Sequence, residues 1–196
     1  MKARIPILIF IIATILATGC VEEPTGAAEM NESAMELQVI AADMQSGIYE
    51  LSLALENQSM ALENVSDATI ELDDHTGNYR MNESSIILPR IEYASGQFEE
   101  SARHSQKAEE FFASAQGKVN NRSVSKIVYN YTSVTHFVKN LADAGVNFTA
   151  ELQKSEPDPW WSVVYHGGVY TWLGHQDAAF ERTGINRTDL SAYSLL

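Results

Sequence analysis

The sequence has little cysteine and little positive charge. One cysteine among 196 residues excludes an internal disulfide and leaves no set of thiolates for a metal site. Lys and Arg number 13 against 26 for Asp and Glu, which gives a formal net charge of −13 at pH 7. Such an acidic surface repels phosphate backbones, so we do not expect the chain to bind nucleic acid.

The apolar run near the N-terminus is too short to cross a membrane. It extends from Ile5 to Thr18, roughly 14 residues where a spanning helix needs about 20. A basic start at Met1–Arg4 followed by a short apolar core is typical of an export signal. We therefore predict a signal peptide at residues 1–19.

The single cysteine stands directly after this predicted signal. The sequence Leu16-Ala17-Thr18-Gly19-Cys20 resembles a lipobox. The resemblance implies cleavage before Cys20, a lipid on that residue and a place at the outer face of the cytoplasmic membrane. Residues 20–28 are then a polar tether. The alternative is a plain signal anchor with an incidental cysteine.

Asparagine occurs mainly in the acceptor motif for N-glycosylation, Asn-x-Ser/Thr with x not proline. Eight of the eleven asparagines begin this motif, where chance gives roughly 1.6. They are Asn31, Asn57, Asn64, Asn82, Asn121, Asn130, Asn147 and Asn186. Because they are spread along the chain, we expect a glycosylated extracellular surface. Together with the lipobox, they resemble archaeal cell-surface lipoproteins.

Residues 29–72 contain no proline and one glycine, and their apolar positions repeat with the period of a helix. One side of the stripe carries the small residues Gly47, Ala54 and Ala61, which let a partner helix approach closely. Similar periods run from Ile91 to about Lys118 and from Ser123 to Leu152. We expect a mainly α fold, an antiparallel bundle of long helices over residues 29–155.

The pattern changes in residues 156–196, which contain all three tryptophans. Residues 160–165 (WWSVVY) and 169–172 (VYTW) are rich in strand-forming residues and flank His166-Gly167-Gly168, so we predict a β-hairpin. A short helix is expected at 176–183, ended by Gly184.

The aromatic residues of this predicted hairpin are candidate ligand contacts. They are Trp160, Trp161, Tyr165, Tyr170 and Trp172. Such a cluster can enclose a cation or stack against a sugar. The alternative is that they cap one end of the bundle.

Two sequence features were compared with catalytic and metal-binding motifs of other proteins, and neither matches fully. Ser123-Val124-Ser125-Lys126 has the Ser-x-x-Lys spacing of penicillin-recognising enzymes, but their companion motifs S-D-N and K-T-G are absent, and Ser123 can simply cap a helix. No two histidines have the i,i+4 spacing of a helical metal site. His166 and His175 flank one arm of the predicted hairpin and can meet. We expect no catalytic residue, no metal and no cofactor.

The segment from Val163 to Tyr170, followed by Gly184-Ile185-Asn186-Arg187-Thr188-Asp189 and Tyr193, resembles the opening of Cache-type extracytoplasmic sensors. The resemblance implies a long helix rising from the membrane and then a strand–turn–strand. The leading expectation is a non-enzymatic surface module that binds a small ligand or an envelope protein, with sensing as one option. The rival expectation is a glycan-bearing structural spacer.

Overall fold

The computed structural model describes residues 27–75, 87–120, 122–154 and 158–191. These residues form helices and turns, with no strand in the described ranges. The helices are α2 (Ala27–His75), α3 (Ile87–Gly117), α4 (Arg122–Leu152), α5 (Pro159–Thr183) and the short α6 (Arg187–Ser191).

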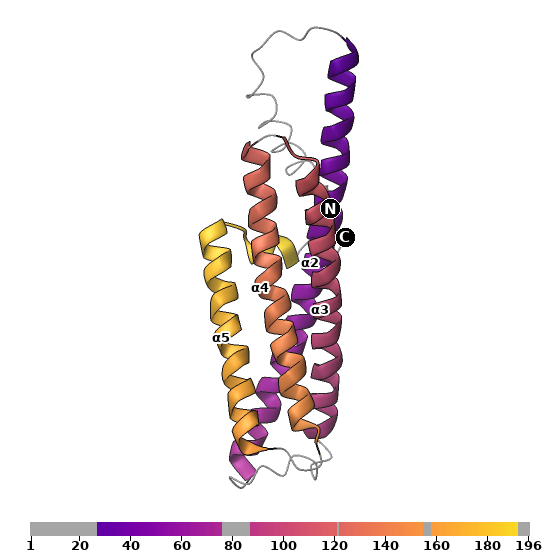
Figure 1. Ribbon diagram of the computed structural model, residues 1–196. Coiled ribbons are helices and arrows are strands. Elements are labelled where there is room, and N and C mark those ends of the chain that lie inside the picture. The colour runs from indigo at the N-terminus through magenta and orange to yellow at the C-terminus, as the bar shows by residue number, and fades with distance from the viewer. Residues whose placement is uncertain (1–26, 76–86, 121, 155–157, 192–196) are drawn as a thin grey trace.

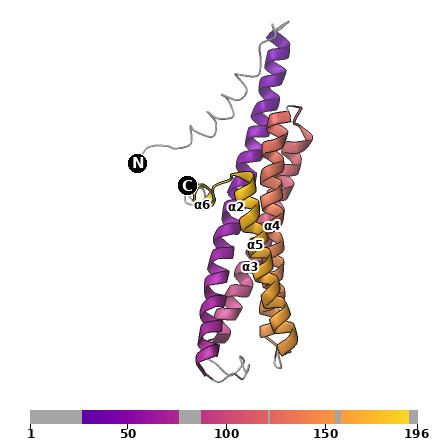
Figure 2. The same cartoon turned by 90° about the vertical axis from the view of Figure 1, so that its left-hand side faces the viewer.

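The long helices run up and down beside one another and pack in chain order, α2 on α3, α3 on α4 and α4 on α5 (Figures 1 and 2). The outer helices α2 and α5 share few contacts, while α6 returns from the end of α5 to α2. With 49 residues, α2 is about 70 Å long. Its first turns project beyond the other helices. The prediction of a mainly helical antiparallel bundle is confirmed.

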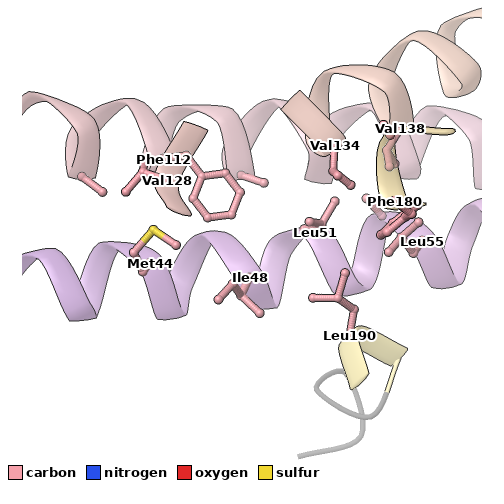
Figure 3. Packing of buried hydrophobic residues seen from close by; sticks show 14 of the residues in the cluster. Met44, Ile48, Leu51, Leu55, Phe112, Val128, Val134, Val138, Phe180 and Leu190 are labelled. Carbon is pink, nitrogen blue, oxygen red and sulfur yellow. The ribbon is translucent and has the colours of Figure 1, made fainter. Parts of the chain in front are cut away.

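The predicted stripe of α2 forms one wall of the core. Met44 and Leu51 are buried, as are the small residues Gly47, Ala54 and Ala61. Figure 3 shows the apolar side chains of α2 facing Phe112 of α3 and the valines of α4. The labelled residues are Met44, Ile48, Leu51, Leu55, Phe112, Val128, Val134, Val138, Phe180 and Leu190.

Two glycines allow rings of α3 to lie against the backbones of the neighbouring helices. A Cβ added to Gly47 of α2 would lie 2.5 Å from a ring carbon of Phe112. A Cβ added to Gly145 of α4 would lie 2.5 Å from the ring of Phe98. Both rings are fully buried. The close approach expected at the small positions of α2 is therefore present, and α4 uses the same device.

Buried polar side chains fix the register of the helices. The amide of Gln58 in α2 donates to the carbonyl of Val138 in α4 at 3.0 Å. The hydroxyl of Ser101 in α3 donates to the carbonyl of Ala54 in α2 at 2.8 Å. Because a buried polar group without a partner is costly, a slip of either helix is disfavoured.

The predicted β-hairpin is wrong. The tryptophan-rich segment belongs to α5, a 25-residue helix that also includes the short helix expected at 176–183. The local preference of tryptophan, valine and tyrosine for strands is outweighed by strong signals at both helix ends and by packing against α4. The expected stop at Gly184 is confirmed.

Candidate functional site

Helix α5 carries the candidate aromatic residues, and capping defines both of its ends. Asp158 is the N-cap, and its carboxylate accepts hydrogen bonds from the backbone N–H groups of Trp160 at 2.8 Å and Trp161 at 3.4 Å. Pro159 follows it, where a missing N–H costs nothing. At the other end Gly184 adopts a left-handed conformation (φ 69°) and donates to the carbonyl of Phe180.

A buried carboxylate ties the start of α5 to the end of α4. The side chain of Glu151 is 3% exposed, and it accepts the backbone N–H of Asp158 at 2.9 Å. The hydrogen bond from the ammonium of Lys154, followed by that N–H, lowers the pKa of Glu151 below its usual value. The carboxylate is thus ionised at neutral pH and holds the N-cap residue of α5 against the end of α4.

One side of α5 packs into the bundle at helical spacing. Ser162, Val169 and Gln176 are buried at intervals of seven residues. Val169 packs in a cluster with buried side chains of α3 and α4, and Phe180 packs beside Leu55 of α2. The opposite side of α5 therefore faces solvent.

That opposite side and its flanks expose large apolar side chains. Trp160 is 70% exposed, Val163 60% and Tyr170 56%. Trp161 and Val164 are also exposed. Pro159–Gln176 contains no Asp, Glu, Lys or Arg, although the chain as a whole is strongly acidic. This uncharged surface is the candidate functional site, and we call it the α5 face.

The five predicted ligand residues do not meet as one cluster. Trp161 stacks on Tyr165 with ring centroids 5.6 Å apart. Trp172 packs against Phe137 of α4 at 6.3 Å, and Tyr170 contacts His166 at 4.8 Å. Trp160, near the start of the helix, is largely exposed. The side chains therefore lie on different sides of α5, an arrangement that suits a broad surface better than an enclosed cage.

The valines of the α5 face were missed by the sequence-based prediction because it placed them in a hairpin. The spacing of Ser162, Val169 and Gln176 carried a signal for a helix, since seven residues make two helical turns. That register places Trp160 and Val164 on the outer side.

The two histidines of α5 do not meet. His166 contacts Phe148 of α4, whereas His175 contacts Phe137 and Trp172. They are nine residues apart on one helix, which separates them by about 13 Å along its axis. Within the described ranges, no group of three His, Cys, Asp or Glu side chains is placed to hold a metal ion.

Ser123 lies in the first turn of α4, which begins at Arg122, but its side chain lies outside the described residues. Because α4 begins one residue earlier, Ser123 is inside the helix and not at the N-cap position predicted from the sequence. Lys126 is exposed on the same helix.

The described acceptor asparagines differ in access. Asn147 on α4 and Asn186 before α6 are exposed, while Asn57, Asn64 and Asn130 are half-buried. Asn57 and Asn64 donate their side-chain N–H to the carbonyl four residues earlier, at 2.9 and 2.8 Å. Asn186 instead uses its side-chain oxygen, which accepts the N–H of Thr188 at 2.9 Å, so its nitrogen is not used in that bond.

Several predicted modification sites cannot be placed. Cys20, Asn82 and Asn121 lie outside the described residues, as does the side chain of Asn31. Among the described helices, none is long and apolar enough to span a membrane.

Comparison with protein-family models, with curated proteins and with solved structures finds no match for this chain.

Proposed function

We propose that this protein is a lipid-anchored, N-glycosylated module at the outer face of the cytoplasmic membrane, and that it binds a protein partner through the α5 face. The observation that carries the binding role is the exposure of Trp160, Val163 and Tyr170 within Pro159–Gln176, the part of α5 that contains no Asp, Glu, Lys or Arg. Contiguous exposed apolar surface on a soluble domain marks an interaction site. No catalytic role is proposed.

A protein partner fits this surface better than a small ligand does. Small-molecule sites are concave and enclose most of the ligand. The aromatic side chains of α5 instead diverge, with Trp161 stacked on Tyr165 and Tyr170 turned toward His166. Exposed Trp and Tyr on a rigid helix are typical of the anchors that dominate protein interfaces.

The α5 face begins at the end of the bundle remote from the start of α2, the helix that follows the proposed anchor (Figure 1). Cys20 precedes the first residue of α2 by seven positions, a span of at most about 25 Å. The chain enters α5 at the end of the bundle remote from the start of α2 (Figure 1). A lipid on Cys20 would therefore leave Trp160 far from its own membrane and open to a partner.

The segment that the resemblance to Cache-type sensors assigned to a strand–turn–strand, residues 163–170, lies within α5. The following Gly184–Asp189 segment caps α5 and begins α6. We therefore propose no sensor function from that resemblance.

A structural spacer is the second candidate function. The length of α2 and the exposed acceptor sites Asn147 and Asn186 favour it. A spacer needs no binding surface, so the two candidates differ in whether the α5 face is occupied in the cell.

Localisation is tested by fractionating cells that produce the full chain. We expect the protein in the membrane fraction, and the variant Cys20→Ser in the soluble fraction. Asn147→Gln and Asn186→Gln should each lower the apparent mass by one glycan. A membrane-bound Cys20→Ser variant would contradict the lipid anchor.

Binding is tested by placing a photo-crosslinking amino acid at position 160 in living cells, with Glu99 as the control position. Glu99 is also exposed but lies on α3. We expect a protein adduct, identified by mass spectrometry, from position 160 and none from position 99. The absence of an adduct from position 160 would favour the spacer.

A further inference from the structure

Helix α5 contains glycines that the isolated chain does not require. A Cβ added to Gly167 or Gly174 would meet nothing within 4 Å, and both glycines have ordinary helical backbone. A glycine inside a helix is destabilising by about 1 kcal/mol relative to alanine. Inside the bundle, Gly47 and Gly145 allow a ring to approach, so a close neighbour is the physical reason for such a position.

The two glycines belong to an exposed stripe that runs the length of α5. Its members are Trp160, Val164, Gly167, Thr171, Gly174 and Ala178, all exposed. They repeat at intervals of four and three, which is the spacing of a helix–helix seam. The stripe is large at its start and small along the rest.

We propose that the α5 face binds a second copy of this chain, with the two α5 helices packed antiparallel across a two-fold axis. This inference rests on the proposed function and names the partner at the same surface. The stripe is symmetric about position 169, so antiparallel pairing sets Trp160 opposite Ala178, Val164 opposite Gly174 and Gly167 opposite Thr171. Each large side chain then lies over a small one, as Phe112 lies over Gly47 within the bundle.

The distribution of charge also favours a second copy of the chain as the partner. Two copies of a chain with net charge −13 repel one another over most of their surfaces. The segment Pro159–Gln176 is free of acidic and basic side chains, so copies meeting there avoid that repulsion.

The surface is large enough for a weak specific dimer. Trp160 lies on the stripe and Tyr170 beside it, and together they leave roughly 250 Å² uncovered in each copy. With Val163, Val164 and the small residues between them, two copies approach the ~1,000 Å² of a specific interface. In a two-fold contact both copies use the same surface, so the assembly ends at a dimer and does not grow into a filament.

Antiparallel pairing sends the starts of the two α2 helices to opposite ends of the assembly. With both copies anchored through Cys20, they stand on opposing membrane surfaces. The contact therefore joins two membranes instead of two neighbours on one membrane.

The test uses the full chain in right-side-out membrane vesicles. One population carries Val164→Cys and another carries Gly174→Cys, with different tags, and the two are mixed under mild oxidation. We expect disulfide-linked pairs that carry both tags, because these positions face each other across the proposed axis. Cys at position 164 is smaller than the valine it replaces, which leaves room for the Cys side chain at position 174. Neither variant alone should form a dimer, since like positions are then about 15 Å apart. The unsubstituted chain and Glu99→Cys are the controls.

A matched pair of glycine variants separates packing from folding. Gly167→Ala lies on the stripe, whereas Gly168→Ala lies beside it, and neither added Cβ meets an atom of the same chain. We expect Gly167→Ala to reduce the disulfide-linked fraction roughly tenfold, because a methyl group obstructs the close approach of two helices. Gly168→Ala should leave that fraction unchanged.

Dimers formed by Val164→Cys alone would overturn the antiparallel pairing, and so would the absence of any pair carrying both tags. Chains recovered in the soluble fraction would instead contradict the anchor. A photo-adduct at position 160 that contains a different protein, without tagged pairs, would leave the binding role in place and overturn the second copy as partner.

Discussion

The glycines of the bundle interior and those of α5 have the same backbone conformation but different surroundings. Gly47 and Gly145 lie beneath the rings of Phe112 and Phe98, where an added Cβ would overlap a ring carbon. Gly174 of α5 has open space where its Cβ would be. In the interior, therefore, ring packing offsets the cost of a helical glycine, whereas on α5 no contact within the chain does so.

The difference separates two kinds of sequence requirement. Gly47 and Gly145 are required by the fold of the single chain, because α3 cannot approach α2 and α4 without them. No contact within the chain requires Gly174 of α5, and a close neighbour from a second chain would supply such a requirement. The predictions below measure each side of this comparison, from the largest expected effect to the smallest.

The largest effect is expected from removing the ring that lies over Gly145. Phe98→Ala should lower the free energy of unfolding by about 3–5 kcal/mol, because it removes a fully buried ring and leaves a cavity against a glycine that cannot fill it. Chemical denaturation of the full chain measures the change. A loss below about 1 kcal/mol would mean that the ring is not tightly packed there.

Adding a methyl group beneath the same ring should have the next largest effect. Gly145→Ala should destabilise the protein by about 1–3 kcal/mol, since the new Cβ would lie 2.5 Å from Phe98 and overpacking outweighs the gain in helix propensity. Gly96→Ala on α3 is the matched control, because its Cβ meets nothing within 4 Å. The comparison fails if both variants change the unfolding midpoint alike.

The end of α5 allows a third, smaller test. Asp158→Ala should cost about 1 kcal/mol, because the N–H groups of Trp160 and Trp161 lose their acceptor. Hydrogen exchange at those amides should rise, with little change in α2 and α3. Asp158→Asn, which can still cap, should exchange like the unsubstituted chain. Equal protection in both variants would show that packing on α4 alone fixes the helix start.

The bundle was predictable because the hydrophobic period, the helix-breaking residues and the helix lengths all indicated the same long helices. The stripe of α2 gave the correct buried side, and the small residues Gly47 and Ala54 gave the places of closest approach. Helix α3 begins at Ile87, two residues before Pro89. The helix tolerates this proline because it falls in the first turn, where its missing N–H has no partner to lose. In this part of the chain, the packing of the helices therefore agrees with the local preferences of the sequence.

Helix α5 was mispredicted because its local and global signals conflict. Tryptophan, valine and tyrosine favour strands, and His166-Gly167-Gly168 is typical of a turn. The capping pair Asp158-Pro159 and the stop at Gly184 indicated a helix across the same residues. The candidate site followed this error, since a hairpin would gather the aromatic residues that a helix distributes around its axis.

The smallest predicted effect has the opposite sign. Gly174→Ala should stabilise the isolated chain by up to about 1 kcal/mol, because the methyl group meets no atom within 4 Å and the unfolded state loses conformational entropy. The unfolding midpoint at protein concentrations too low for self-association measures it. A destabilised variant would mean that Gly174 already has a close neighbour within its own chain. That neighbour would remove the reason for seeking a second helix at this position.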